Sequence, residues 1–336
     1  MQAIRFFDKG VARLAEMPVA DLKPGEALVR VRASGLCHTD IDVLHARYGT
    51  GAFPVVPGHE FAGEVVRTAD TAGGIREGMR VAVDPNLSCG HCRACRRGLT
   101  NLCSDLKAYG VTQDGGFADY AVVRVDHLHD IGDMPYERAA LAEPLACVLN
   151  GLEAAEIGRS ARLPETALIY GAGPIGLLLG LALQSAGVAH VAVADLNAYR
   201  LQFAEGLGFE AVEAGSSDLA ARRHGFDLVA DATGVPSVVE GMIDQVADGG
   251  TVMIFGVCAP DARIALSPFE IFRRQIRLSG SHSLNGNIPD ALRILARDGE
   301  RLSKLVSHRL PIADMLPFFA AKSQDPATMK VQFVAD

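Results

Sequence analysis

The middle of the chain alternates short apolar runs with longer amphipathic ones, and this alternation constrains the fold more than any other feature. Between residues 166 and 208 the order is TALIYG, PIGLLLGLALQSAG, HVAVAD and NAYRLQFAEGLG. The order continues with FDLVADAT, a helix through PSVVEGMIDQVAD, GTVMIFG and IRLSGS. Strands that alternate with helices of this length form βαβ units, because parallel strands need a crossover connection between them. We therefore predict an α/β domain with a doubly wound parallel sheet.

A glycine-rich turn marks the first strand-to-helix junction of this domain. Gly171, Gly173 and Gly176 give the pattern GxGxxG directly after the strand TALIY. Glycines there allow a tight turn and close approach of the backbone to a pyrophosphate, which the helix N-terminus attracts. Asp195 ends the next strand nineteen residues later, where a carboxylate binds the ribose hydroxyls and repels a 2′-phosphate. The pattern predicts a Rossmann domain that binds NAD rather than NADP, through Gly171, Gly173, Pro174, Ile175, Gly176 and Asp195.

Each of these residues also has a purely structural interpretation. The glycines could form an ordinary βα turn, and Asp195 could cap the following helix. Arg200 lies one turn into that helix. It could contact the adenine of the cofactor, but a side chain that faces solvent is at least as good an interpretation. We expect the cofactor role for the glycines and Asp195, because the strand, the helix and the acid occur together.

Four of the seven cysteines lie within fifteen residues. Their spacing, C-x2-C-x2-C-x7-C, suits a closed tetrahedral zinc site that leaves no position for a substrate. The N-terminal segment carries charges and lacks the apolar stretch of a secretory signal, so we expect a cytoplasmic location, where clustered cysteines bind metals more often than they form disulfides. We predict a structural zinc in a lobe of about residues 85–107, with an iron–sulfur cluster as the alternative. Its ligands would be Cys89, Cys92, Cys95 and Cys103.

The overall charge argues against nucleic-acid and membrane functions. Basic residues near the cysteines could belong to a nucleic-acid-binding zinc ribbon, but the chain carries a net charge of −8, which disfavours binding to a phosphate backbone. The uncharged stretch between Glu165 and Asp195 is long enough for a membrane span, but its glycines and Pro174 interrupt it. We therefore expect neither nucleic acid nor membrane as a partner.

A second set of metal-ligand residue types lies in the first part of the chain. Residues 1 to about 145 contain the β-rich runs EALVRVRASG, EFAGEVV, RVAVDP and FADYAVV, which predict a mostly antiparallel sheet. The last strands, LVSHRLP and KVQFV, would find their partners in this sheet. Cys37, His59 and Glu60 offer the thiolate, imidazole and carboxylate that hold a catalytic zinc with an open position. From spacing alone the metal site would be a guess, because a lone buried cysteine is usually a small hydrophobic residue and a lone histidine is more often structural.

Together these motifs resemble those of a known family. GLCHTD, PGHEFAGEVV, the four-cysteine segment, AEPLACVLNG and GAGPIG occur in the order and at the separation found in zinc-containing medium-chain dehydrogenases, over essentially the whole chain. The chain is most similar to the polyol branch, which includes sorbitol dehydrogenases, because Glu143 stands where alcohol dehydrogenases carry a ligand cysteine. The resemblance implies a β-rich GroES-like catalytic domain of residues 1–148 and 285–336 around a Rossmann domain of residues 149–284.

The resemblance also implies an activity and a role for each residue. Cys37, His59 and Glu60 would bind a catalytic zinc, and Glu143 would reach it directly or through water. Thr39 would accept the proton of the substrate hydroxyl, and Tyr48 and Phe117 would line the substrate pocket. The implied enzyme holds two zinc ions and transfers a hydride from a secondary alcohol, a polyol or sugar alcohol, to NAD. It forms a homodimer or homotetramer.

Some positions depart from the family pattern and leave details open. Asp42 stands where relatives often carry a histidine of the proton relay, and Ser281-His282 stands where sorbitol dehydrogenases have Arg-Tyr. The outer relay and the identity of the polyol therefore stay open. Cys147 and Cys258 match neither zinc site, and we expect both to be buried. The alternatives are a reductase, a dehydrogenase of another alcohol such as threonine or a cyclic polyol, and a catalytically silent zinc- and nucleotide-binding protein.

Overall fold

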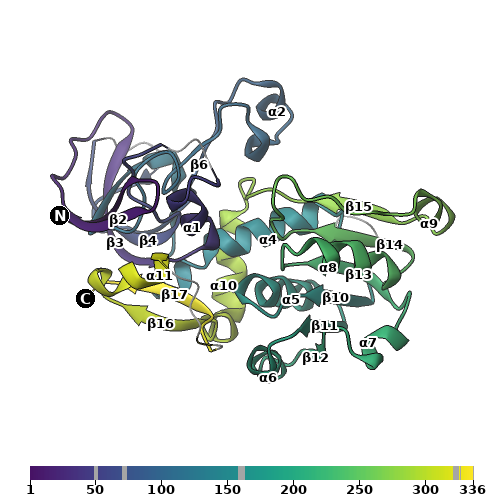
Figure 1. The fold of residues 1–336 in the computed structure, drawn as a ribbon. Helices are drawn as coiled ribbons and strands as arrows, with labels where there is room; N and C mark the ends of the chain where they lie inside the picture. The colour runs from purple at the N-terminus through teal and green to yellow at the C-terminus, as the bar shows by residue number, and fades with distance from the viewer. Residues whose placement is uncertain (49–51, 70–73, 158–162, 321–324, 326, 336) are drawn as a thin grey trace. The chain divides into compact units, whose positions relative to one another are not determined.

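The computed structural model describes residues 1–48, 52–69, 74–157, 163–320, 325 and 327–335 (Figure 1). The chain divides into two compact units. One unit consists of Met1–Ala146 together with Leu284–Asp336, and the other consists of Cys147–Ser283. Both ends of the chain thus contribute to the first unit, and the second unit is a single continuous segment. Within the described residues, no helix has the length and apolar character needed to cross a membrane.

The second unit is an α/β domain around a six-stranded sheet (Figure 1). The strand order is β12-β11-β10-β13-β14-β15, and every neighbouring pair is parallel. This order confirms the predicted doubly wound topology, which reverses direction between β10 and β13. The strands are β10 (Thr166–Tyr170), β11 (His190–Asp195), β12 (Glu210–Glu213), β13 (Phe226–Asp231), β14 (Val246–Ile254) and β15 (Arg277–Gly280). The helices are α5 (Pro174–Ala186), α6 (Ala198–Gly206), α7 (Ser217–Ala221), α8 (Pro236–Gly241) and α9 (Pro268–Arg273), with a 3-10 turn η4 (Met242–Asp244).

Apolar side chains of the central strands form the core of this unit. Leu168 and Val229 are fully buried and Val252 is almost so, as expected for parallel strands with both faces covered. The predicted helix through residues 236–248 was wrong at its end, because helical structure stops at Asp244 and β14 begins at Val246. Val246 is buried and pairs with Phe226 in the sheet. The segment from Val246 onward is therefore a strand, because it pairs with β13, and not the end of a helix.

The first unit is built on a seven-stranded sheet of order β16-β17-β3-β4-β5-β9, in which β8 also pairs with β3. All pairs are antiparallel except β16 with β17, which confirms the predicted class. The strands are β3 (Glu26–Gly35), β4 (Glu60–Thr68), β5 (Arg80–Val83), β8 (Tyr120–Arg124), β9 (Leu128–Asp130), β16 (Val306–Leu310) and β17 (Lys330–Val334). A separate hairpin pairs β1 (Gln2–Asp8) with β2 (Val11–Glu16). The helical segments are α1 (His38–Leu44), η3 (Val125–His127), α3 (Tyr136–Ala139), α10 (Ile288–Ser303), η5 (Ile312–Met315) and α11 (Leu316–Ala320). A further helix, α4 (Ala142–Ala154), begins in this unit.

An aromatic cluster lies in the core of the first unit. The ring of Phe319 meets those of Phe6 and Phe117 edge-on, at centroid distances of 5.4 and 5.1 Å. Such pairs contribute roughly 0.5–1.5 kcal/mol each beyond the burial of their surface. The proposed pocket role of Phe117 finds no support here, because its side chain has 0% exposure and packs inside this cluster.

The four-cysteine segment forms a lobe of the first unit, with α2 at its projecting end (Figure 1). The lobe contains a short ladder of β6 (Asn86–Leu87) with β7 (Lys107–Ala108), the helix α2 (Arg93–Arg96) and the 3-10 turn η2 (Thr100–Leu102). Asn285 binds the lobe through both ends of its amide. Its Oδ1 accepts from the backbone and hydroxyl of Thr100 at 3.0 and 2.7 Å, and its Nδ2 donates to the Gly98 carbonyl at 2.9 Å. The lobe is thus attached to a segment far away in the sequence.

Candidate functional site

Cys37, His59 and Glu60 lie together at the paired ends of two strands. One ligand atom from each residue lies within 4.8 Å of the others. Cys37 follows β3 and precedes the first residue of α1, and His59 immediately precedes β4. The antiparallel pairing of β3 with β4 sets Gly35 opposite Glu60. This pairing explains why two segments that are separate in the sequence meet at one site.

A buried carboxylate, Asp40, lies behind His59. Its Oδ1 is 3.4 Å from Nδ1 of His59, and its Oδ2 accepts from the backbone N–H of Cys37 at 2.9 Å. It has 0% exposure, and Oδ1 also accepts from the N–H of Gly58 at 3.1 Å. A carboxylate so placed fixes the orientation of a ligand histidine. Sequence analysis missed Asp40, although its place three residues after Cys37, in the first turn of α1, was a usable signal.

The electrostatic environment of His59 suits a cation. Burial alone would lower the pKa of His59, but the charges of Asp40 and then Cys37, with hydrogen bonds to both, raise it well above its ordinary value. A site that stabilises the imidazolium so strongly presents a negative field. The donor set of thiolate, imidazole and carboxylate matches the ligands that zinc takes in proteins. The residues therefore fit a divalent metal ion.

Glu60 is held by a buried lysine that sequence analysis did not identify. Nζ of Lys330 donates to Oε1 and Oε2 of Glu60 at 2.7 and 2.6 Å, and to the carbonyl of Leu36 at 3.1 Å. The two side chains are 5% and 1% exposed. Burial would lower the pKa of Lys330, but the charges of Glu60 and then Cys37 raise it above its ordinary value. The lysine is therefore a buried cation beside the candidate metal ligands.

Thr39 and Glu143 take different places around this cluster. Thr39 is half-buried in the first turn of α1, two residues from Cys37. Glu143 is buried in the first turn of α4, and its charge helps to raise the pKa of Lys330. Within the described part of the chain, the ligand atoms that lie within 4.8 Å of one another at this site come from Cys37, His59 and Glu60. Glu143 is not among them. Glu143 thus lies in the electrostatic surroundings of the group.

The four clustered cysteines form a second group of ligand atoms within 4.8 Å of one another: Cys89, Cys92, Cys95 and Cys103. Backbone N–H groups point at their sulfurs, as at Cys103, which accepts from the N–H of Cys89 and of Asp105 at 3.3 Å each. Backbone hydrogen bonds from Cys95 and Ser104 lower the pKa of Cys92 to about 5. Loss of water contact raises the pKa of Cys95 to about 11. Four thiols at one point with amide donors fit a closed zinc site.

The glycine-rich turn connects β10 to α5 and packs against neighbouring backbone. Gly171 has a φ of 104°, in the left-handed region that favours glycine. A Cβ at Gly176 would lie 1.8 Å from the carbonyl oxygen of Gly171, so only glycine fits there. Gly173 precedes the first residue of α5, Pro174, and Ile175 follows in the same turn. The N-terminus of this 13-residue helix favours an anionic group.

Asp195 and Arg200 flank this turn. Oδ2 of Asp195 accepts from the N–H of Ala172 at 2.7 Å, and Oδ1 accepts from that of Asn197 at 2.9 Å. Asn197, rather than Asp195, caps α6, so the capping alternative for Asp195 is wrong. Arg200 is half-buried, and its Nη1 lies 3.7 Å from the position that a Cβ of Gly173 would take. Its Nε is buried without a hydrogen-bond partner within the described residues.

Two expectations about the other cysteines were wrong in degree. Cys147 and Cys258 are half-buried rather than buried. Cys258 lies in the segment after β14, where its neighbour Val257 is 77% exposed, and Cys147 lies on a partly exposed face of α4.

Asp42 stands at the position of the proton relay that the sequence left open. Its carboxylate forms an ion pair with Arg47 at 2.9 Å.

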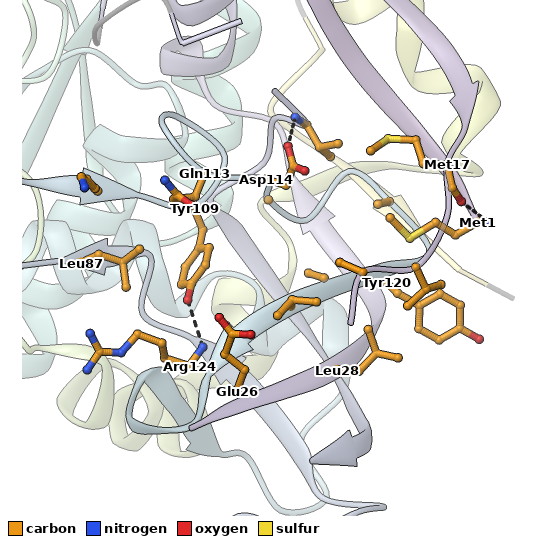
Figure 2. A pocket seen from close by; sticks show the side chains of 18 of the residues that line it. Met1, Met17, Glu26, Leu28, Leu87, Tyr109, Gln113, Asp114, Tyr120 and Arg124 are labelled. Carbon is orange, nitrogen blue, oxygen red and sulfur yellow. Dashed lines mark hydrogen bonds between the residues drawn. The ribbon is translucent and has the colours of Figure 1, made fainter. Parts of the chain in front are cut away.

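A groove of about 540 Å³ lies elsewhere in the first unit (Figure 2). Its walls include Glu26, Tyr109 and Arg124, and Tyr109 accepts from the backbone N–H of Arg124 at 3.0 Å. None of Cys37, His59 and Glu60 lines it. Hollow shape alone therefore does not mark the candidate site, which is defined by its ligand chemistry.

Known proteins resemble the whole chain. It is 65% identical, over 100% of both chains, to D-altritol 5-dehydrogenase from Agrobacterium fabrum. It is 32% identical to D-arabinitol dehydrogenase 1 from Uromyces fabae, over 88% of this chain and 85% of that protein. Among solved structures, a zinc-binding dehydrogenase from Sinorhizobium meliloti 1021 bound to NADP superposes with a TM-score of 0.93, at 30% identity and 99% coverage of both chains.

Two family models match successive parts of the sequence. The alcohol dehydrogenase GroES-like domain matches residues 23–133, and the zinc-binding dehydrogenase model matches residues 174–297. The first match covers the candidate metal residues and the four cysteines, and the second begins at Pro174, inside the glycine-rich turn. The resemblance found in the sequence is thereby confirmed. The chain belongs to the zinc-binding dehydrogenases with an alcohol dehydrogenase GroES-like domain, and it is an oxidoreductase of that family.

Proposed function

We propose that this enzyme oxidises a secondary hydroxyl of a polyol, of the altritol type, to a ketone with NAD as the acceptor. The observation that carries the proposal is the buried group of Cys37, His59 and Glu60 in a chain 65% identical throughout to D-altritol 5-dehydrogenase. The arabinitol relative supports the same substrate class. We also expect a cytoplasmic location and a homodimer or homotetramer. Sedimentation of the purified protein would test the oligomeric state.

The chain's own residues would divide the work of the reaction. Cys37 and His59 would hold the catalytic zinc, with Glu60 and Glu143 as the carboxylates beside it, and the four-cysteine lobe would hold a second zinc. When bound, zinc supplies a Lewis acid that lowers the pKa of an alcohol, and NAD supplies the hydride acceptor. Asp40 orients His59. Thr39 would accept the hydroxyl proton at its Oγ1 and pass its own proton outward.

Asp195 supports NAD over NADP. The backbone N–H groups of Ala172 and Asn197 hold its carboxylate at the end of β11. Each oxygen retains a lone pair for a ribose hydroxyl, whereas a 2′-phosphate would meet its negative charge. The solved relative that holds NADP is 30% identical, so both cofactors belong in the assay.

A substrate panel tests the proposal. Purified zinc-loaded enzyme would be assayed with NAD and, separately, with NADP, for formation of the reduced cofactor from D-altritol, D-arabinitol, sorbitol, an inositol, ethanol and L-threonine. We expect the highest kcat/KM with a polyol and little turnover of ethanol or threonine. A clear preference for threonine or a simple alcohol would contradict the substrate class. No NADH from any alcohol, with about one zinc per chain, would support the silent alternative.

A further inference from the structure

The chain passes between the two compact units along two links, and hydrogen bonds connect these links to each other. The first link is α4, which begins in one unit, carries Glu143 in its first turn, and ends in the other unit. The second link is the crossover segment, residues 282–285, and the boundary between the units lies directly after Ser283. The buried Asn150 of α4 donates from Nδ2 to the carbonyls of His282 and Ser283, at 3.2 and 2.7 Å. One side chain of the first link therefore holds the beginning of the second.

The four-cysteine lobe holds the other end of the crossover segment. Asn86, in β6 of the lobe, donates from Nδ2 to the carbonyl of Leu284 at 2.9 Å. Asn285 accepts from the backbone and the hydroxyl of Thr100 at 3.0 and 2.7 Å. It also donates to the carbonyl of Gly98 at 2.9 Å. The lobe thus contacts the chain at the two residues that follow the boundary between the units.

Ser283, in the middle of the crossover segment, has a backbone conformation that serine seldom adopts. Its φ is 54°, in the left-handed region, which is uncommon for residues other than glycine. Such a conformation costs free energy and persists only where the surrounding contacts impose it. Here the imposing contacts come from Asn150 before the boundary and from the lobe after it. The conformation of the crossover segment is therefore set by these contacts and not by local preference.

We propose that Asn285 is a positioning residue for hydride transfer, through which the lobe fixes the crossover segment and so the geometry in which alcohol and cofactor react. The inference rests on the proposed function. In that function the alcohol binds beside Cys37 and His59 of the first unit, and the cofactor binds at the glycine-rich turn of the second. Hydride transfer tolerates little error, since a misplacement of about 1 Å can cost about 100-fold in rate. The lobe then serves the reaction in addition to its own stability.

The test separates hydride transfer from binding. Zinc-loaded full-length enzyme is mixed with NAD and D-altritol in a single-turnover experiment, and the dissociation constant of NADH is measured by fluorescence titration. We expect Asn285→Ala to slow hydride transfer by about tenfold. Its Kd for NADH should stay within about twofold of the wild-type value, with about two zinc ions per chain. A rate of hydride transfer within about twofold of wild type would overturn the proposal.

Two variants of the lobe act as partner and control. Thr100→Val keeps the size of the side chain but removes its hydrogen bond to Asn285, and should slow hydride transfer by about threefold. Added to Asn285→Ala, it should change the rate by less than about twofold, because both variants remove the same contact. Leu102→Ala alters a side chain of the same turn that is 52% exposed, and should leave the rate unchanged. Additive losses, or an equal loss in Leu102→Ala, would overturn the proposal.

A second measurement needs no substrate. In hydrogen exchange read by mass spectrometry, Asn285→Ala should speed exchange of the peptide that spans residues 282–287 by about tenfold or more. The peptide that spans the glycine-rich turn should exchange as in wild type. Unchanged exchange at residues 282–287 would overturn the proposal. If Asn285→Ala does not fold, Thr100→Val serves for both measurements. Failure of the proposed function is recognised separately, because wild type would then form no NADH from any polyol.

Discussion

Asp40 links three parts of the candidate metal site through one side chain. Its carboxylate contacts the imidazole of His59 and accepts from the backbone N–H groups of Cys37 and Gly58. Because it has 0% exposure, water cannot take over these contacts if the carboxylate is removed. A buried group that orients a ligand controls metal affinity without touching the metal.

Asp40→Asn should therefore weaken zinc binding at this site. The amide keeps the size of the side chain, but it carries no charge and only one acceptor oxygen. We expect zinc affinity at the catalytic site, or kcat/KM, to fall by about 10- to 100-fold. Zinc competition with a chelator measures the effect, and Asp42→Asn on the same helix is the matched control. Equal zinc affinity in Asp40→Asn and wild type would show that Asp40 has no orienting role.

Asp195 is the residue that we expect to select the cofactor. Asp195→Ala should lower kcat/KM for NAD by about tenfold or more, since hydrogen bonds to a charged group are lost, and should spare NADP. Asp195→Asn keeps an acceptor for the N–H of Ala172, and so separates loss of charge from loss of the local hydrogen bond. An unchanged ratio of NAD to NADP use in both variants would contradict the ribose assignment.

Individual residues were predictable from sequence where chemistry and spacing coincide. Cys37, His59 and Glu60 carry ligand atoms inside recognisable motifs, and the structure brings these atoms together. Lys330 was not predictable, because 270 residues separate it from Glu60 and its segment looks like an ordinary strand. Only the pairing of β17 with β3 places it beside the metal ligands.

The four-cysteine lobe is an element whose own secondary structure is slight. Its ladder pairs two residues with two, and α2 has four residues. Cross-linking by zinc would replace the core that so short a segment lacks. Cys92→Ser should therefore lower the melting temperature by at least about 5 °C, and should release one zinc. Cys258→Ser, outside the lobe, is the control. A melting temperature equal to that of wild type would show that the lobe needs no metal.

Zinc binding by the lobe should weaken as the pH falls. Loss of water contact raises the pKa of Cys95 to about 11, so this thiol is protonated at neutral pH without metal. Zinc requires the thiolate, and binding therefore releases a proton. Lowering the pH supplies that proton and favours the metal-free form, by about tenfold in affinity for each pH unit and proton released. Competition with a chelator between pH 6 and pH 8 measures the slope. A flat profile would contradict ligation by Cys95.

Elements were predictable where periodicity is long and uninterrupted. The strands β10, β11 and β13 and the helix α5 follow the apolar runs read from the sequence. The end of the segment 236–248 was not predictable. Its helical sequence pattern continues past Asp244, but the residues from Val246 onward form β14, which pairs with β13. Pairing between distant strands overrides local preference at such a boundary.

At the scale of the whole molecule, the family assignment depends on the order of motifs along the chain. A glycine-rich turn alone predicts a nucleotide-binding domain, and a cysteine cluster alone predicts a zinc lobe. Together with Cys37 and His59 they specify a zinc-binding dehydrogenase, which the matches over residues 23–133 and 174–297 confirm. The polyol itself was not predictable in this way, since its selection depends on side chains outside these motifs.

Cys37 and its neighbours should hold a metal that the oxidation of a polyol requires. The most direct measurement compares wild type with Cys37→Ser for zinc content and for NADH formation with D-altritol. We predict about two zinc ions per chain and NADH formation for the wild type, and about one zinc and no NADH for the variant, with both proteins folded. Full activity in Cys37→Ser lacking one zinc would contradict the claim.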